Sequence, residues 1–260
     1  MKNLKCCCTV ILMALLAGCS APPQQIALAP TARTQIKSAS CVIIKTQNEL
    51  NANIEKSFLK ENPMTLGLLG VMIGNGIEGD REIEANKTIS PIRSVLADYN
   101  VESKLSGNLH PILKKVVWLN AKQVNIKEAF DFKTEQAILK LNDHNTDVLV
   151  VIKPSYALTP AFKDLVMSID LDIYPHSEQM KASLPNDQKD KNWPIYRTKV
   201  KHTWTLNTEA VSESDAEKNA TLWVENHGEQ IKAALNETTG ILLKKIEEQL
   251  NDPEAVVKIT

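Results

Sequence analysis

Two neighbouring segments of different pattern constrain the fold more than any other feature of the sequence. Residues 148–152 are five consecutive apolar side chains, VLVVI, which is typical of a strand buried on both faces. Residues 165–174 alternate instead, with apolar side chains at every second position and Asp170 and Asp172 between them. Such alternation is typical of a strand with one buried and one solvated face. The two segments predict a central strand and an antiparallel neighbour, joined by a turn at 158–162.

A third strand is predicted over residues 193–206, where basic side chains alternate with apolar ones. Arg197 and Lys199 would share the solvated face with Asp170 and Asp172, so we expect ion pairs across the strands. Acid–base catalysis by the two carboxylates is the less favoured interpretation, because the sequence indicates no cleft around them.

The remaining apolar patterns predict helices packed against this sheet. The chain is expected to end in a long amphipathic helix from about residue 214 to residue 250. The fold class predicted is α+β, with a mainly antiparallel sheet and a single domain over residues 39–260. The other expected elements are a strand at 41–46, a helix at 48–60, a helix that begins at Ser90-Pro91 and runs to 97, a helical patch at 109–115, a strand at 116–119 and a short helix at 134–141.

Composition excludes several classes of protein. The chain is 43% apolar, with 30 Lys and Arg against 31 Asp and Glu, so it is neither disordered nor basic enough for a nucleic-acid-binding surface. Once a leader is removed, Cys41 is the only cysteine besides Cys19, so no internal disulfide is expected. Cys41 lies in an apolar strand pattern, where cysteine behaves as a small hydrophobic residue.

The N-terminus has the pattern of an export signal. Lys2 and Lys5 give a short positive region, and the apolar stretch 6–17 that follows is twelve residues long. A helix of that length covers about 18 Å at ~1.5 Å per residue, which is too short for a ~30 Å hydrocarbon core. Residues 1–18 are therefore predicted to be a signal peptide and not a transmembrane anchor.

The signal ends in the sequence LAGC at residues 16–19, which resembles the lipobox of bacterial lipoproteins at every position. The resemblance implies cleavage before Cys19, a diacylglycerol thioether on its sulfur and acylation of the new amino group, with palmitate as a typical acyl chain. Because Ser20 and not Asp follows, the sorting pattern of such lipoproteins implies the outer membrane, with the domain facing the periplasm. An ordinary secretory signal with a chance cysteine is the alternative. Residues 19–38, rich in Ala, Pro, Gln and Thr, are expected to form a flexible lipidated tether.

Residues 64–79 hold five of the nine glycines and begin with an apolar run. In a helix, Gly70 and Gly74 would share a face and permit close approach of another backbone. Three interpretations stay open: packing inside the domain, contact with a second copy or a partner, and insertion into a membrane surface. A dinucleotide site at the GNGIEG sequence of residues 74–79 is disfavoured, because the preceding segment is a poor strand.

The sequence predicts no catalytic, cofactor-binding or metal-ligating residue; Cys19, as the lipidation site, is the only site residue. The five histidines have no H-x-x-x-H spacing, and there is no G-x-S-x-G motif. Asp143, His144 and Asp147 offer metal-ligand chemistry, but a polar loop before a strand is the simpler interpretation.

The order of elements over residues 90–250 resembles the small periplasmic domain of penicillin-binding-protein activator lipoproteins, of the curli-secretion lipoprotein and of the N-terminal part of the Tol-system β-propeller protein. The matching segments are ISPIRSVLADYN, TDVLVVIKP, LVMSIDLDIYP and YRTKVKHTWTL. The resemblance implies a non-catalytic domain that binds another envelope component, and it transfers no individual binding residue. Two other hypotheses remain: an enzyme acting on cell wall or lipid through a dispersed site, and a self-oligomerising lipoprotein that uses residues 64–79.

Overall fold

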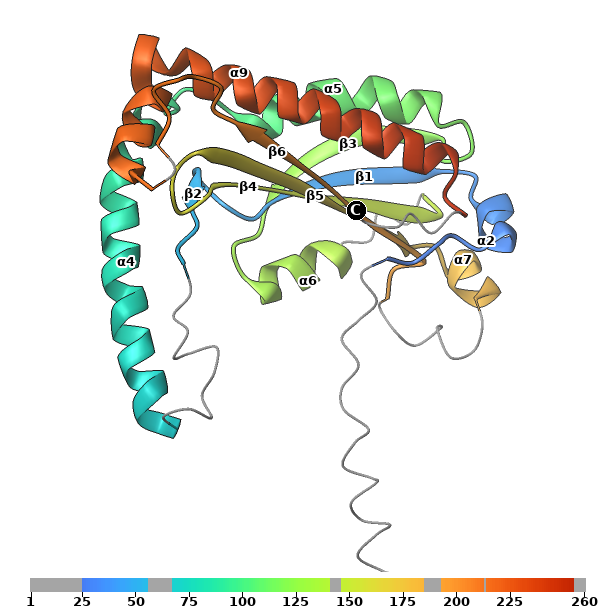
Figure 1. The fold of residues 1–260 in the computed structure, drawn as a ribbon. Coiled ribbons are helices and arrows are strands. Elements are labelled where there is room, and N and C mark those ends of the chain that lie inside the picture. Colours follow the sequence, from blue (N-terminus) through green and yellow to red (C-terminus); the bar gives the residue numbers. More distant parts are fainter. Residues whose placement is uncertain (1–24, 56–66, 141–145, 185–192, 213, 255–260) are drawn as a thin grey trace, which may run out of the picture.

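The computed structural model describes residues 25–55, 67–140, 146–184, 193–212 and 214–254, with backbone only for 67–77. A β-sheet carries helices on both faces (Figure 1). Helices α5 and α9 lie side by side over one face, and the shorter α6 lies under the other. Helix α4 stands at one end of the sheet, and α2 and α7 lie near the other end. The helices are α2 (Pro30–Gln35), α4 (Gly67–Val95), α5 (Val101–Lys115), α6 (Phe132–Lys140), α7 (Glu178–Ser183) and α9 (Ala216–Asn251).

The sheet is mixed. Its strands run in the order β3-β1-β4-β5-β6, and a short strand β2 pairs with the far end of β4. Strand β1 is parallel to both β3 and β4, whereas β4–β5 and β5–β6 are antiparallel. The strands are β1 (Ala39–Lys45), β2 (Asn51–Ala52), β3 (Ala121–Glu128), β4 (Val148–Leu158), β5 (Asp164–Pro175) and β6 (Tyr196–Thr205).

The α+β class and the long C-terminal helix are confirmed, but the expectation of a mainly antiparallel sheet holds only for β4, β5 and β6. The strands β3, β1 and β4 are parallel because helical crossovers connect them: α4 and α5 lie between β1 and β3 in the chain, and α6 lies between β3 and β4. Of these helices, α5 and α6 cover opposite faces of the sheet. Strand β1 accordingly reads as a continuous apolar run, the pattern of a parallel strand buried on both sides.

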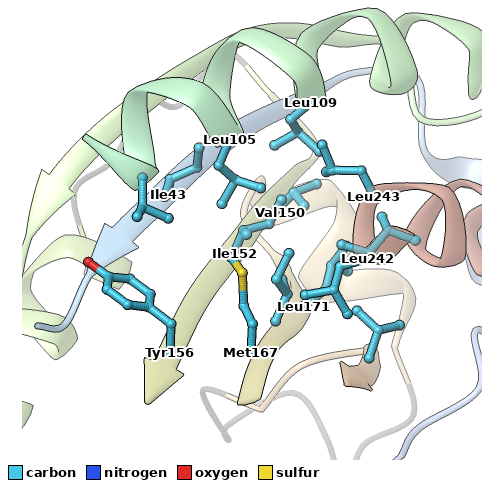
Figure 2. Close-up of a cluster of buried hydrophobic side chains, with 14 of the residues drawn as sticks. Ile43, Leu105, Leu109, Val150, Ile152, Tyr156, Met167, Leu171, Leu242 and Leu243 are labelled. Carbon is cyan, nitrogen blue, oxygen red and sulfur yellow. The ribbon is translucent and has the colours of Figure 1, made fainter. Parts of the chain in front are cut away.

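The main core lies between the sheet and the pair α5 and α9 (Figure 2). The alternation in β5 is confirmed, since the apolar side chains at every second position from Leu165 to Ile173 are fully buried. Trp223 of α9 is also fully buried, and its indole N–H donates to the carbonyl of Phe162 at 2.6 Å. A smaller cluster on the opposite face includes Val42, Leu149 and Val151 beneath Ile138 of α6.

The flexible tether expected over residues 19–38 is wrong from Ile26 onward, because these residues belong to the domain. Ile26 forms a bridge with Arg197 of β6, and Leu28 is buried with its N–H bonded to the carbonyl of Pro253. The hydrophobic faces of α2 and its flanks, at Ala32 and Ile36, complete this contact. The alanine and isoleucine residues around α2 are spaced irregularly among threonines and prolines, so the sequence shows no helical or strand period there. Tertiary contacts, and not a local pattern, order this segment.

Three local predictions are wrong. Residues 48–55 contain no helix but the strand β2, and the rest of the predicted helix lies outside the described residues. Residues 116–119 form a turn before β3. Ser90-Pro91 does not begin a helix but lies inside α4. Pro91 has no N–H to donate to the carbonyl four residues earlier, but because Pro91 is exposed, water can hydrate that carbonyl and the helix continues.

Helix α9 is interrupted at residues 225–228. Its N-terminus is capped as expected, with the side chain of Asp215 accepting from the backbone N–H of Lys218. At the interruption, Asn226, His227 and Gly228 adopt positive φ, and a Cβ at Gly228 would lie 2.5 Å from a methyl carbon of Val95. Glycine is required there by both the backbone conformation and the close approach of α4.

We therefore expect Gly228→Ala to lower the free energy of unfolding by about 2–4 kcal/mol, through left-handed backbone strain and displacement of Val95. Gly240→Ala is the matched control in the same helix, since nothing lies within 4 Å of a Cβ at that position. It should raise stability by about 0.5–1 kcal/mol, because alanine is the better helix former. Denaturant unfolding followed by circular dichroism measures both, and equal stability of the two variants would contradict the account.

Candidate functional site

Charged side chains of β4, β5 and β6 form a network on the α6 side of the sheet. The guanidinium of Arg197 donates to both carboxylate oxygens of Asp172, at 2.7 and 3.1 Å. Tyr174 donates its hydroxyl to Asp172 at 3.1 Å, and the ammonium of Lys153 lies 3.8 Å from the same carboxylate and 3.0 Å from Glu135 of α6. The network therefore joins three strands and a helix.

The predicted ion pairs across β5 and β6 are confirmed, but the face is only partly solvated. Asp172 is 1% exposed because its partners surround it. Burial, together with the nearby charge of Asp172, raises the pKa of Tyr174 above its usual range. The hydrogen bond from Arg197 to Asp172 likewise raises the pKa of Arg197. Two strand positions away, the pair of Asp170 with Lys199 is exposed. The buried network thus holds β4, β5 and β6 together.

A cavity of about 480 Å³ opens where β1 ends, at the carboxyl edge of the parallel strands. Its lining comes from the end of β1, the loop before β2, the end of α4, the start of α5 and strand β4. Glu102 in the first turn of α5 is only 4% exposed, and it accepts a hydrogen bond from the hydroxyl of Tyr156 at 3.3 Å. Figure 2 shows Tyr156 at the margin of the core, with its hydroxyl pointing away from the apolar cluster. We call this the Glu102 cavity.

A second cavity of about 600 Å³ lies between α4, the turn after β4 and the start of α9. Four carboxylates and Arg81 line it, and Arg81 is engaged with the backbone carbonyl of Glu55. Asp215 among the carboxylates caps α9, so this acidic group is partly structural.

The other residues that the sequence analysis singled out have structural roles, wherever they lie among the described residues. Cys41 is fully buried in β1, and burial raises its pKa to about 12, so it is an inert thiol. Asp147 accepts from the backbone N–H groups of Lys37 and Ser38 and so fixes the start of β1. Cys19, Asp143 and His144 lie outside the described residues, and so does Met64 at the start of the glycine-rich segment.

The glycine sequence at residues 74–79 lies within the backbone of α4, so it does not form the strand–turn–helix that a dinucleotide site requires. Within the described ranges, no three His, Cys, Asp or Glu side chains are grouped so as to hold a metal ion. Of the helices in the same ranges, none is both long and apolar enough to cross a bilayer.

Sequence reasoning missed Glu102 and Tyr156. They are 54 residues apart, and neither belongs to a motif. Asn100 and Glu102 form the ordinary polar start of a helix, with Asn100 accepting from the N–H of Ser103, which gives no sign that the carboxylate is buried. Only the parallel pairing of β1 with β4 brings Tyr156 to this helix start.

Neither protein-family models nor curated proteins give a match to this chain. The resemblance to envelope lipoproteins therefore stays a prediction.

We expect Asp172→Ala to lower the free energy of unfolding by about 3–5 kcal/mol, because it leaves Arg197 and Lys153 partly buried without their carboxylate. Asp170→Ala removes an exposed pair of the same kind, so it should change stability by less than about 1 kcal/mol. Urea unfolding of the two variants checks the contrast. A loss for Asp172→Ala no larger than for Asp170→Ala would show that the network does not join the strands.

Proposed function

We propose that the protein is a lipid-anchored, non-catalytic component of the bacterial outer membrane that binds another envelope component. The observation that carries the proposal is the sequence LAGC at residues 16–19 behind a short apolar stretch. The N-terminus combines, in this order, a short positive region, an apolar stretch too short to span a bilayer and a cysteine at the cleavage position, which is the pattern of an export signal.

The way the chain enters the domain supports a location close to the membrane. Ile26 is held against β6 by two backbone hydrogen bonds to Arg197, of 2.9 and 3.0 Å. Seven peptide units separate Cys19 from Ile26, so the two residues lie at most ~25 Å apart in any conformation. A lipid on Cys19 would therefore keep the β6 edge within that distance of the bilayer surface.

The described charges support binding more than catalysis. Asp172, Lys153 and Arg197 neutralise one another in a buried network, an arrangement that holds strands together. The Glu102 cavity, in contrast, contains a carboxylate with no cationic partner among the described residues, which is a feature of recognition sites. An enzyme that acts on cell wall or lipid remains the alternative, and it would need chemistry that this cavity does not itself provide.

Self-association is a second candidate function, supported by helix α4. The helix reaches beyond the level of α6 at its N-terminal end (Figure 1). Most side chains of residues 80–87 are exposed, and Ile83 is 71% exposed. A helix that extends beyond its own domain offers a surface to a second copy of the chain.

We expect the wild-type chain to incorporate radioactive palmitate in the outer-membrane fraction and Cys19→Ala to lose the label. Cys41→Ala is the matched control and should keep the label, because Cys41 is buried in β1. Gel autoradiography of fractionated cells measures incorporation. A soluble, unlabelled wild type would refute the anchor, and the absence of any specific crosslink in intact envelopes would contradict the binding part of the proposal.

If self-association is the function, Gly70→Leu combined with Gly74→Leu should abolish oligomers, because both positions share one face of a helix where close approach needs glycine. Gly107→Leu on α5 is the control, since a Cβ there meets nothing within 4 Å. Sedimentation of the detergent-solubilised proteins measures mass. A monomeric wild type would exclude this candidate.

A further inference from the structure

We propose that the Glu102 cavity binds an ammonium group carried on an aliphatic chain, supplied either by a lysine side chain of a protein or by a free primary amine. The inference deepens the proposed function, since it names the chemistry through which an envelope partner would be recognised. It rests on the geometry of the cavity and does not need the lipid anchor.

The first observation is a buried carboxylate with too few partners. Glu102 is 4% exposed and forms one hydrogen bond, at 3.3 Å, from the hydroxyl of Tyr156. It forms no ion pair with any described residue. A carboxylate offers about four lone-pair sites, so most of its accepting capacity is unused among the described residues. Buried charges are ordinarily paired, and an external cation would supply the missing partner.

The second observation is that the cations lining the cavity already have partners. Arg93 contacts the carboxylate of Glu49 at 3.1 Å and donates to the carbonyl of Leu50 at 2.9 Å. Lys45 pairs with Glu128 at 3.2 Å. Arg93 is thus paired with a carboxylate of the cavity lining and Lys45 with a carboxylate of β3, and neither forms an ion pair with Glu102 among the described residues. The cavity therefore selects a ligand of positive charge.

The start of α5 explains how the buried carboxylate is tolerated. Glu102 lies in the first turn of the helix, where the partial positive charge of the helix terminus, about half an elementary charge, favours an acidic side chain. Half a charge compensates the carboxylate only in part. A full ammonium charge brought beside it would complete the compensation.

The walls of the cavity indicate the rest of the ligand. Leu96 and Tyr99 are only partly buried, so they present apolar surface to the cavity, and the buried Leu50 and Leu235 lie beside them in its lining. Its volume of about 480 Å³ falls in the range of small-ligand sites, ~300–1,000 Å³. An apolar wall beside one buried carboxylate suits an aliphatic stem that ends in a cation, which is the shape of a lysine side chain. An ammonium group can donate to Glu102 and to the oxygen of Tyr156 together.

The test is a calorimetric titration of the purified mature protein in detergent with Nα-acetyl-lysine amide. Nα-acetyl-norleucine amide, which keeps all four side-chain carbons of lysine but lacks the ammonium group, is the matched ligand control. We expect the lysine derivative to bind at least about tenfold more tightly, because one charged hydrogen bond in a shielded site is worth about that much. Equal binding of the two ligands, or no binding of either, would overturn the proposal without any variant.

Two variants locate the site. Glu102→Gln keeps the shape of the side chain and should weaken lysine-amide binding by about tenfold or more. Asp170→Asn is the control, because Asp170 is an exposed carboxylate outside the cavity lining and its loss should change affinity less than about twofold. Thermal unfolding of each variant confirms folding, and unchanged affinity in a folded Glu102→Gln would place the ligand elsewhere and overturn the proposal.

A third ligand, n-butylamine, distinguishes the two sources of the ammonium group. Binding as tight as that of the lysine derivative supports a free amine, and weaker binding supports a lysine within a protein. The outcomes also separate this inference from the proposed function. Absence of palmitate label from the wild type would refute the lipid anchor without affecting the cavity result. Equal binding of the lysine and norleucine derivatives would refute the ammonium site without affecting the anchor.

Discussion

The parallel pairing of β1 with β4 is the constraint on which the rest of the structure depends. The two strands pair from Ala39 opposite Val148 to Ile43 opposite Ile152, and the paired side chains are buried on both faces. On its β1 side, strand β4 then has no paired strand until β2 joins it at Ala157, while β5 stays paired on the other side. The unpaired interval is where Tyr156 turns its hydroxyl toward Glu102. The Glu102 cavity is thus a consequence of two parallel strands of unequal length.

The same pairing explains why the two faces of the sheet differ so much in chemistry. The long helices α5 and α9 lie over one face, and the side chains that β5 turns toward them are apolar and fully buried. The short α6 covers only part of the other, and polar side chains of β4, β5 and β6 fill what remains. Asp172 is buried there among Arg197, Lys153 and Tyr174, so its charge must be paired.

Some of this could be predicted from the sequence, because strict periodicity identifies a surface of known polarity. The alternation of β5 predicted its buried face and the acidic partners of Arg197 and Lys199 correctly. The strand β3 was missed because it is an exposed edge strand, AKQVNIKE, in which polar side chains dominate both faces. Parallel direction was also missed, since the apolar run of β1 indicates burial but not orientation. Glu102 gave no signal, because burial of a charged residue depends on contacts between distant segments.

The positions of the chain entry and of the cavity are compatible with binding at a membrane surface. Ile26 pairs with Arg197 at the β6 edge. Across the sheet, Arg197 lies opposite Asp172 of β5, and Asp172 lies opposite Val151 of β4. Tyr156 lies five residues further along β4, which is about 17 Å at ~3.4 Å per residue, and two strands away from β6. A lipid on Cys19 would hold the domain by the β6 edge and leave the carboxyl edge of β1 uncovered. A short anchor would therefore limit the distance of the domain from the bilayer without closing the cavity, and would leave Glu102 within reach of the partner proposed above.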